Sequence, residues 1–249
     1  MAERRRLLID SHRLQCANGQ RRFELEDHES RYLRKVLRLK PGSQVDVIDG
    51  CGHLWMARLL DGQHLELCTD LTVPSQSVIS PLPTVGLAIA LIRRGMDDVM
   101  RMACELGVDR LQPIDCQRCV PQAEHRPERW RSIVHEAVEQ CERLWAPQLP
   151  ELCAAVDWWG KPDQNDLRLI AVTREVGSPR LTELLATRTS EDRSIWLSIG
   201  PEGGWSDKEL AAAQSAGWLF VSLGDTILRS STAAVAGASS LTNWRALRC

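Results

Sequence analysis

Apolar and polar positions follow two different patterns along the 249-residue chain. From residue 85 onward, continuous apolar runs predict buried strands, at 85–92, 108–114, 167–173, 194–199 and 218–223. Between and after these runs, helical periodicity predicts helices, at 97–106, 129–143, 178–186, from 206 and from 230. This order of elements predicts an α/β fold with a mostly parallel sheet and helices on both of its faces.

The first 70 residues carry shorter runs. Alternating apolar positions predict strands, at 5–9, 44–49, 53–60 and 63–68. The turns between them contain Asp49-Gly50-Cys51-Gly52 and Asp61-Gly62, and a helix at 28–39 stops before Pro41-Gly42. Short strands with one helix predict a small β-barrel domain.

The segment that joins these two regions has the composition of a linker. Residues 69–84 contain three prolines and three serines, which disfavour regular structure. We therefore expect a β-barrel domain at 1–70, a linker at 71–84 and an α/β domain at 85–249. A chain with 43% hydrophobic and 26% charged residues suits this division into globular domains.

The formal net charge of −2 conceals an uneven distribution. Residues 1–40 hold eleven Lys and Arg against six Asp and Glu, whereas the remainder holds twenty against twenty-seven. A basic segment on an acidic body indicates that one end of the chain contacts a polyanion. The alternative for any single basic run is a solvated charged face.

The cysteines and the N-terminal sequence indicate in which cellular compartment the protein is located. The nine cysteines are scattered, which favours reduced thiols over a disulfide framework. Cys116-Gln117-Arg118-Cys119 is a lone C-x-x-C, and because no second pair closes a zinc site, no metal is expected. No apolar run is long enough to span a bilayer, and the basic start is not followed by the apolar segment of a secretory signal. We therefore expect a cytoplasmic protein.

Glycine-bearing turns follow two of the predicted strands. One is Ile199-Gly200-Pro201-Glu202-Gly203-Gly204, and the other begins with Leu223-Gly224. Gly203 and Gly204 are suited to positive φ and to close approach of the backbone to a ligand. A capping box of Ser206 and Glu209 predicts a helix start directly after the first turn.

The two turns together predict a small-molecule crevice, because ligands bind at the carboxyl ends of strands in open α/β sheets. Either turn alone would be an ordinary strand-to-helix connection. The chain contains neither a G-x-G-x-x-G sequence nor a P-loop, so the common dinucleotide and nucleoside-triphosphate signatures are missing.

In their sequence and order, the two turns resemble the cofactor loops of the SPOUT-class RNA methyltransferases, and most closely those of the RsmE family. The stretch from Leu33 to Gly42 resembles the N-terminal PUA-like RNA-binding barrel of that family. Glu105-Leu106-Gly107-Val108 and the segment from Glu136 to Arg143 also look like family motifs. The resemblance implies a trefoil-knotted C-terminal domain, S-adenosylmethionine as cofactor, and methylation of a uridine ring nitrogen, N3, in small-subunit ribosomal RNA.

The resemblance also implies which residues bind the cofactor. Three loops form the pocket: Val172 to Glu175, Ile199 to Gly204 and Leu223 to Ala233. The residues expected to bind the cofactor are Thr173, Glu175, Ile199, Gly200, Pro201, Glu202, Gly203, Gly204, Leu223, Gly224, Ile227, Leu228, Arg229, Thr232 and Ala233.

The third loop departs from the family pattern at two positions. Thr226 stands where the family usually has arginine, and Ser231 where it usually has glutamate. A serine is a poor base at neutral pH unless it is activated. Three interpretations stay open: that carboxylate is not the base, Glu202 or Glu175 takes its place, or activity is weak.

Arg229 is the principal catalytic candidate, with Glu202 as the second. Deprotonation of a uridine ring nitrogen builds charge on the flanking carbonyl oxygens, and a fixed guanidinium stabilises such charge. The alternative is an arginine that braces the loop or a partner subunit. Because the sulfonium methyl group is already activated, the reaction needs no metal.

RNA contacts are expected from basic residues in both domains. The family's lysines near Asp97 and at position 102 are missing here, and other arginines are expected to compensate. The RNA-binding candidates are Arg34, Lys35, Arg38, Arg93, Arg94, Arg118 and Arg143.

The last helix carries a run of small residues from Ala233 to Ser240, which allow another backbone to approach closely, either the knot core or a partner subunit. The resemblance favours both, so we expect a homodimer with the active site near its interface and Trp244 as an anchor of the contact. Two other functional hypotheses remain. One is an RNA-binding or ribosome-assembly protein that keeps the pocket but has lost turnover. The other is a generic nucleotide-binding α/β enzyme, which would not explain the basic N-terminal domain.

Overall fold

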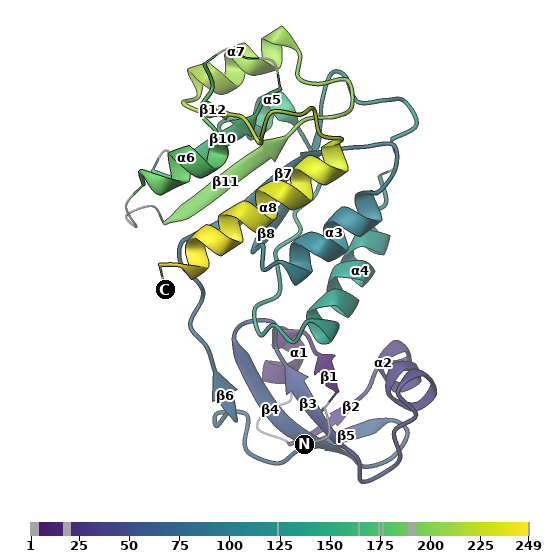
Figure 1. Cartoon of the computed structure of the whole chain (residues 1–249). Coiled ribbons are helices and arrows are strands. Elements are labelled where there is room, and N and C mark those ends of the chain that lie inside the picture. The colour runs from purple at the N-terminus through teal and green to yellow at the C-terminus, as the bar shows by residue number, and fades with distance from the viewer. Residues whose placement is uncertain are drawn as a thin grey trace. The chain divides into compact units, whose positions relative to one another are not determined.

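The computed structural model describes residues 5–16, 21–123, 125–163, 165–173, 175, 177–188 and 193–248. The chain divides into two compact units (Figure 1). The first comprises Met1–Ser80 with His135–Ala146, and the second comprises Pro81–Val134 with Pro147–Cys249. This grouping differs from the expected boundaries, because 71–80 and 135–146 belong with the first unit.

The first unit is built on a six-stranded mixed sheet. Its order is β1-β3-β4-β5-β2, with β6 paired to β4, and only β1 and β3 run parallel. The strands are β1 (Arg6–Leu8), β2 (Arg22–Glu24), β3 (Gln44–Ile48), β4 (His53–Leu59), β5 (His64–Leu67) and β6 (Gln76–Ser77). Alternate residues such as Val45, Ala57 and Leu65 are fully buried in one core, as the period of two requires.

The helix expected at 28–39 is shorter and divided. It consists of α2 (Asp27–Arg31) and a π-helical segment, η1 (Tyr32–Val36), after which Arg38 takes a φ of 55°. The N–H of Leu39 bonds back to the carbonyl of Leu33, which closes the turn and ends the helix. The helix α1 (Ser11–Cys16) and the strands β2 and β6 were not expected, because each is too short to set up a recognisable period.

The second unit is an α/β domain on a six-stranded, wholly parallel sheet. The order is β12-β10-β11-β7-β8-β9. The strands are β7 (Thr84–Ala90), β8 (Arg110–Asp115), β9 (Cys153–Ala154), β10 (Leu167–Ala171), β11 (Ser194–Ile199) and β12 (Leu219–Val221). The predicted fold class, an α/β domain with a parallel sheet, is therefore confirmed.

Helices cover both faces of this sheet. The helices of this unit are α3 (Met96–Glu105), α5 (Ala155–Trp158), α6 (Leu181–Ala186), α7 (Asp207–Ser215) and α8 (Ser230–Ala246), with the first part of α4 (Pro127–Gln140), whose residues from His135 belong to the first unit. Helix α8 lies along β7 and β11, beside α3 and α6 (Figure 1). Trp196 of β11 packs on Trp158 of α5, whereas its neighbour Leu197 meets Gly237 of α8. Because successive strand residues face opposite ways, α5 and α8 lie on opposite faces.

Two helix boundaries differ from the sequence prediction. Helix α6 begins at Leu181 rather than at Ser178-Pro179, because Pro179 and Leu181 form backbone hydrogen bonds with Ser222 and are held extended. Helix α4 ends at Gln140, and Glu142 then takes a φ of 63°. Arg143, which the sequence prediction placed in the same helix as Gln140, therefore lies outside it.

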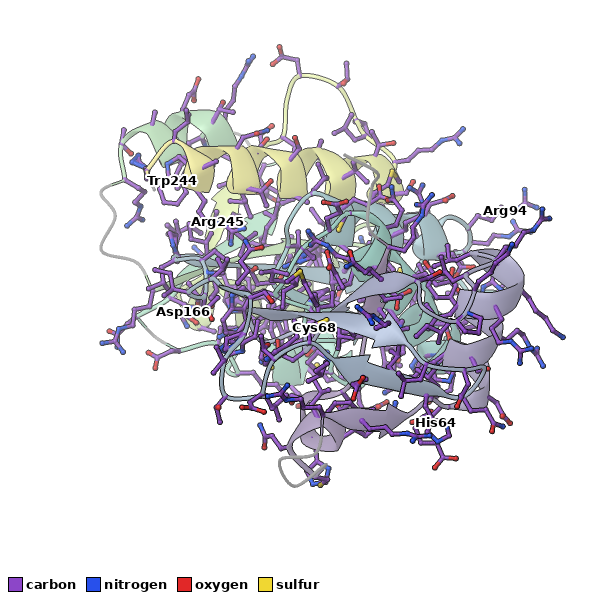
Figure 2. The ribbon with its side chains drawn as sticks, turned by 90° about the horizontal axis from the view of Figure 1, so that it is seen from below. His64, Cys68, Arg94, Asp166, Trp244 and Arg245 are labelled. Carbon is purple, nitrogen blue, oxygen red and sulfur yellow. The ribbon has the colours of Figure 1, made fainter. Side chains whose placement is uncertain are left out.

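The small residues of α8 serve contacts inside the second unit. A Cβ on Gly237 would lie 2.3 Å from Cδ2 of Leu197, so only glycine allows α8 to approach β11 this closely. Trp244 is buried, and its indole N–H donates to the carbonyl of Leu185 in α6. Trp244 therefore anchors α8 to its own domain, and its part in a dimer contact stays a prediction. Figure 2 labels it at the end of α8.

Candidate functional site

A pocket of about 640 Å³ opens at the carboxyl ends of β10, β11 and β12. Its walls come from three chain segments, which run from Ala171 to Glu175, from Ile199 to Leu210 and from Ser222 to Ala233, together with Arg118. The two glycine-bearing turns follow β11 and β12, which are separated in the sheet by β10. The first loop, which follows β10, therefore lies between the second and third loops and completes the pocket wall.

Most residues expected to bind a cofactor line this pocket. They are Thr173, Glu175, Ile199, Gly200, Pro201, Glu202, Gly203, Gly204, Leu223, Gly224, Ile227, Leu228, Arg229 and Ala233. Thr232 does not line it and points outward from the first turn of α8, where it is exposed. Arg174, within the first expected loop, lies outside the described residues.

The glycines of the second loop have distinct physical roles. Gly204 takes a φ of 71°, as expected, with nothing within 4 Å of an added Cβ. Gly203 does not have a positive φ; instead, its Cβ would lie 2.8 Å from the carbonyl oxygen of Arg118. The close approach at Gly203 is therefore made by another part of the protein backbone.

We expect Gly203→Ala to weaken ligand binding in the pocket about tenfold, because the turn that carries Arg118 must move away. Gly204→Ala is the matched control, since it strains φ without a clash and costs roughly 1–2 kcal/mol of stability. Calorimetric affinities and melting temperatures of both variants test this. Equal affinity in Gly203→Ala and the parent chain would contradict the role assigned to Gly203.

Trp205 ties the second loop to the first. Its indole N–H donates to the carbonyl of Ala171, the last residue of β10, at 2.9 Å. Its ring packs edge-on against Trp159, 5.3 Å between centroids, and Trp159 meets Trp218 at 5.1 Å. A cluster of aromatic side chains thus supports the floor of the pocket.

The helix after the second loop begins as predicted. Ser206 caps α7 by accepting the N–H of Glu209, whose carboxylate accepts the Ser206 N–H at 2.8 Å. The other carboxylate oxygen accepts the N–H of Gln117 at 2.8 Å. Glu209 is buried. Its carboxylate therefore does two things: it completes the capping box of α7, and it ties the loop after β8 to the pocket wall.

Asp225 fixes the third loop. Both of its carboxylate oxygens accept from Arg180, at 2.6 and 2.7 Å. Among the described residues, the backbone N–H groups of Thr226, Ile227 and Leu228 have no hydrogen-bond acceptor. These three residues line the pocket, so their free donors are within reach of a bound ligand.

Arg229 stands at the junction of the third loop and α8, as the residue before the first helical turn. Its side chain is exposed and lines the pocket. Within the described ranges the guanidinium forms no hydrogen bond or ion pair, and only the backbone carbonyl of Arg229 is engaged, by the N–H of Ala233. The guanidinium therefore braces no described part of the loop.

Glu202 is engaged with a neighbouring loop. Its Oε1 accepts the backbone N–H of Arg93 at 2.9 Å, which holds the segment after β7 against the second loop. Ser231 lies beside the same segment, since its Oγ would be 3.9 Å from a Cβ on Gly95. Position 231, where the family usually has a glutamate, therefore faces the start of α3.

The basic candidates occupy separate places. Arg34 and Lys35 lie on η1 and are exposed, as is Arg38 just after it. Arg93 and Arg94 are exposed on the loop after β7, and Figure 2 shows Arg94 projecting from the surface.

Arg118 and Arg143 have different surroundings. Arg118 lines the pocket and donates to the carbonyl of Trp205 at 2.8 Å. Because it is also exposed, it is both part of the pocket wall and a cation at the surface. Arg143 is half-buried and belongs to the first unit.

Sequence reasoning did not identify Trp205, Glu209 or Arg180 as residues of the site. The capping box revealed one hydrogen bond of Glu209 but not its bond to Gln117. Nothing in the spacing of Arg180 and Asp225, 45 residues apart, indicates that they meet. In the described part of the chain, no group of three or more His, Cys, Asp or Glu side chains is arranged for a metal ion, and no helix has the length and apolarity to cross a membrane.

The fold and pocket are those of an RNA methyltransferase domain, whose family model matches residues 80–242. A second model, the RNA methyltransferase PUA domain, matches residues 25–67. The ribosomal RNA small subunit methyltransferase E of Synechocystis sp. is 39% identical over 81% of this chain and 66% of its own length. The enzyme of the same name from Rickettsia conorii is 30% identical over 84% of each chain.

Solved structures agree with these relatives. Ribosomal RNA small subunit methyltransferase E from Neisseria gonorrhoeae, crystallised with S-adenosyl methionine, superposes with a TM-score of 0.79 over 97% of this chain and 98% of its own, at 26% identity. A methyltransferase from Legionella pneumophila, also bound to this cofactor, gives a TM-score of 0.78 at 26% identity over 96% of each chain. The chain belongs to the ribosomal RNA small subunit methyltransferase E family.

Proposed function

We propose that this protein transfers the methyl group of S-adenosylmethionine to N3 of a uridine in small-subunit ribosomal RNA. The observation that carries the proposal is the pocket, which the three loops expected from the sequence build together at the ends of β10, β11 and β12. Relatives whose names give them ribosomal RNA methyltransferase activity support the reaction class. The choice of N3 and of uridine comes from the family resemblance.

The pocket fits the proposed cofactor in size and chemistry. A cavity of about 640 Å³ is within the usual range for small-molecule sites. The backbone N–H groups at 226–228 offer hydrogen bonds to a polar ligand, and the apolar side chains of Ile199, Leu223 and Ile227 offer contacts to a ring. When bound, the cofactor supplies a methyl group activated by the sulfonium charge.

The protein's own residues contribute mainly by positioning. Trp205 and Asp225 hold the second and third loops in fixed places, which keeps the pocket preorganised. Arg229, at the rim, provides a planar cation for charge that develops on the uracil carbonyl oxygens. A preorganised donor of this kind needs no rearrangement during the reaction.

The three interpretations of Ser231 also apply to the group that accepts the uridine proton: no carboxylate at this position is needed, Glu202 or Glu175 takes its place, or activity is weak. Glu202 lines the pocket, with one oxygen engaged by the Arg93 N–H and the other without a described partner. Glu175 also lines it and is exposed. Variants of these two carboxylates, measured for the pH dependence of kcat, separate the alternatives.

The N-terminal domain is proposed to contact RNA through Arg34, Lys35 and Arg38, which are exposed around η1. Since each phosphate contact adds about 0.7 to the slope of log K against log[salt] on single-stranded RNA, removing three contacts should lower the slope by about two. The test variant is Arg34→Gln, Lys35→Gln and Arg38→Asn, because asparagine tolerates the φ of 55° at position 38.

Binding to small-subunit RNA at several salt concentrations measures this slope. Arg131→Gln is the control, since Arg131 is held by Glu128 and Glu151. An unchanged slope in the triple variant would mean that this basic face is only solvated surface.

Arg93 and Arg94 are proposed as a second RNA contact. With the start of α3, they line a cavity of about 430 Å³. The loop that carries them is fixed to the pocket by Glu202. RNA phosphates bound there would bring a nucleotide close to the methyl-transfer site.

We further propose a knotted C-terminal domain and a homodimer, from the family resemblance, and a cytoplasmic location, from the scattered cysteines and the N-terminal sequence. Ile227, an apolar residue at the pocket rim, is 65% exposed, which suits an interface near the site. Sedimentation at micromolar concentration should give a dimer, and a monomer would rule it out.

The rival function is a non-catalytic RNA-binding protein that keeps the pocket. The observation behind it is Ser231, which offers no carboxylate next to Gly95. Calorimetry with S-adenosylmethionine tests the pocket that both functions share. Absence of binding would reject both and leave only a generic α/β fold.

A further inference from the structure

The turn that follows β8 brings two cysteines together beside the pocket. Cys116 and Cys119 occupy the ends of a hydrogen-bonded turn, in which the N–H of Cys119 donates to the carbonyl of Cys116 at 3.0 Å. The N–H of Cys116 in turn donates to Sγ of Cys119 at 3.3 Å. The ends of such a turn are less than about 7 Å apart, which is the separation that a disulfide spans.

The two thiols differ in exposure and in acidity. Cys116 is buried within the cluster that contains Trp159 and Trp205, whereas Cys119 is partly exposed. The hydrogen bond from the Cys116 thiol, aided by the Cys116 N–H, lowers the pKa of Cys119. The same hydrogen bond between the two thiols, together with burial, raises the pKa of Cys116. Cys119 is therefore the more acidic and the more accessible thiol of the pair, as in a dithiol whose outer cysteine attacks first.

The same turn forms part of the pocket wall. Between the cysteines, Gln117 donates its N–H to Glu209, and Arg118 donates to the carbonyl of Trp205, both at 2.8 Å. The carbonyl of Arg118 also packs against Gly203. A change in the backbone of this turn would therefore shift the second loop, which it contacts directly.

We propose that Cys116 and Cys119 form a reversible redox dithiol, and that their disulfide draws Arg118 away from Trp205 and weakens ligand binding in the adjacent pocket. The oxidant is a low-molecular-weight disulfide of the glutathione class. The formation of the disulfide is independent of the proposed methyltransferase function, whereas its effect on S-adenosylmethionine binding rests on that function.

The exchange proceeds in two balanced steps. The Cys119 thiolate attacks one sulfur of the small disulfide, forms a mixed disulfide and releases one small thiolate. That thiolate takes the proton of Cys116, whose sulfur then attacks Sγ of Cys119 and expels the second small thiolate, which is protonated by water. The two protein thiols are oxidised, and the small disulfide is reduced to two thiols. The loss of the Cys119 charge in the first step makes ionisation of Cys116 easier.

The test uses the full chain, equilibrated with reduced or oxidised glutathione. Peptide mass mapping after alkylation should find a disulfide between Cys116 and Cys119 in the oxidised sample, and calorimetry should find about tenfold weaker S-adenosylmethionine binding, restored by reductant. Cys116→Ser and Cys119→Ser should lose this sensitivity. Cys68→Ser, at an exposed cysteine of the first unit labelled in Figure 2, should keep it.

The two halves of the proposal can fail separately. Free thiols at both positions in oxidised glutathione would overturn the dithiol, whether or not the cofactor binds. A mapped disulfide with unchanged affinity would overturn the coupling to the pocket. If the reduced chain binds no S-adenosylmethionine, the proposed function and the coupling both fail, while the mapped disulfide still stands.

Discussion

Arg229→Ala is expected to lower kcat about 10²–10³-fold while leaving the affinity for S-adenosylmethionine nearly unchanged, since this is the usual cost of removing one preorganised donor. The reason is structural. Arg229 lines the pocket, yet in the ranges that the structure describes its guanidinium has no hydrogen-bond or ion-pair partner. A residue that braced the loop would have such partners. Arg229→Lys should restore activity only in part, because an ammonium group cannot reproduce the planar fork of a guanidinium.

Arg180→Ala is the matched control for Arg229. Arg180 does brace the third loop, through Asp225, and both side chains of this pair are well exposed. Its removal should therefore weaken cofactor binding modestly, with a small loss of stability. If Arg229→Ala instead lowers cofactor affinity and melting temperature together, the arginine has a structural role, and full activity would reject both roles.

Arg245→Met is expected to destabilise the second unit by roughly 3–5 kcal/mol, the usual cost of leaving a buried charge without its ion-pair partner. Arg245 forms an ion pair with Asp109 and donates to the carbonyls of Gly107 and Pro83, at 2.8 and 3.3 Å. Both charged side chains are nearly buried, with exposures of 10% and 12%. These bonds fasten the end of α8, labelled at Arg245 in Figure 2, to the chain around β7 and β8.

Urea denaturation of the single and double variants measures this contribution. Asp109→Asn keeps an acceptor for the N–H of Val85, which Asp109 binds at 2.8 Å, but removes the buried negative charge. The double variant should therefore be more stable than Arg245→Met alone. A loss below about 1 kcal/mol in Arg245→Met would show that this pair contributes no more than an exposed ion pair.

The sequence predicted five of the six described strands of the parallel sheet because each forms an apolar run bounded by clear breaks, but it missed β9, which has only two residues. It also predicted the start of α7, since the capping box of Ser206 and Glu209 is a local signal. The start of α6 was wrong because a distant contact decides it: Pro179 and Leu181 bond to Ser222, more than forty residues away. Local propensity holds no information about such pairing.

In the candidate site, too, features with a local sequence signal were predicted, and features that depend on distant contacts were not. Two of the three loops were predicted from their own glycine-bearing turns and the first from the family resemblance, and all three line one pocket. The role of Gly203 could not be predicted, because its neighbour is Arg118, from the loop after another strand. The strand order, which inserts β10 between β11 and β12, is likewise a tertiary property. Trp244, expected at a dimer contact, is held by Leu185 within its own domain.

The central claim is methyl transfer to small-subunit ribosomal RNA from a cofactor held by the three loops. The most direct measurement supplies purified small subunits with S-adenosylmethionine labelled in its methyl group, and then maps the modified base. We predict one labelled uridine, methylated at N3, with the rate of labelling lowered about 10²–10³-fold in Arg229→Ala. Cofactor binding without transfer of label would contradict the claim and favour a non-catalytic RNA-binding protein.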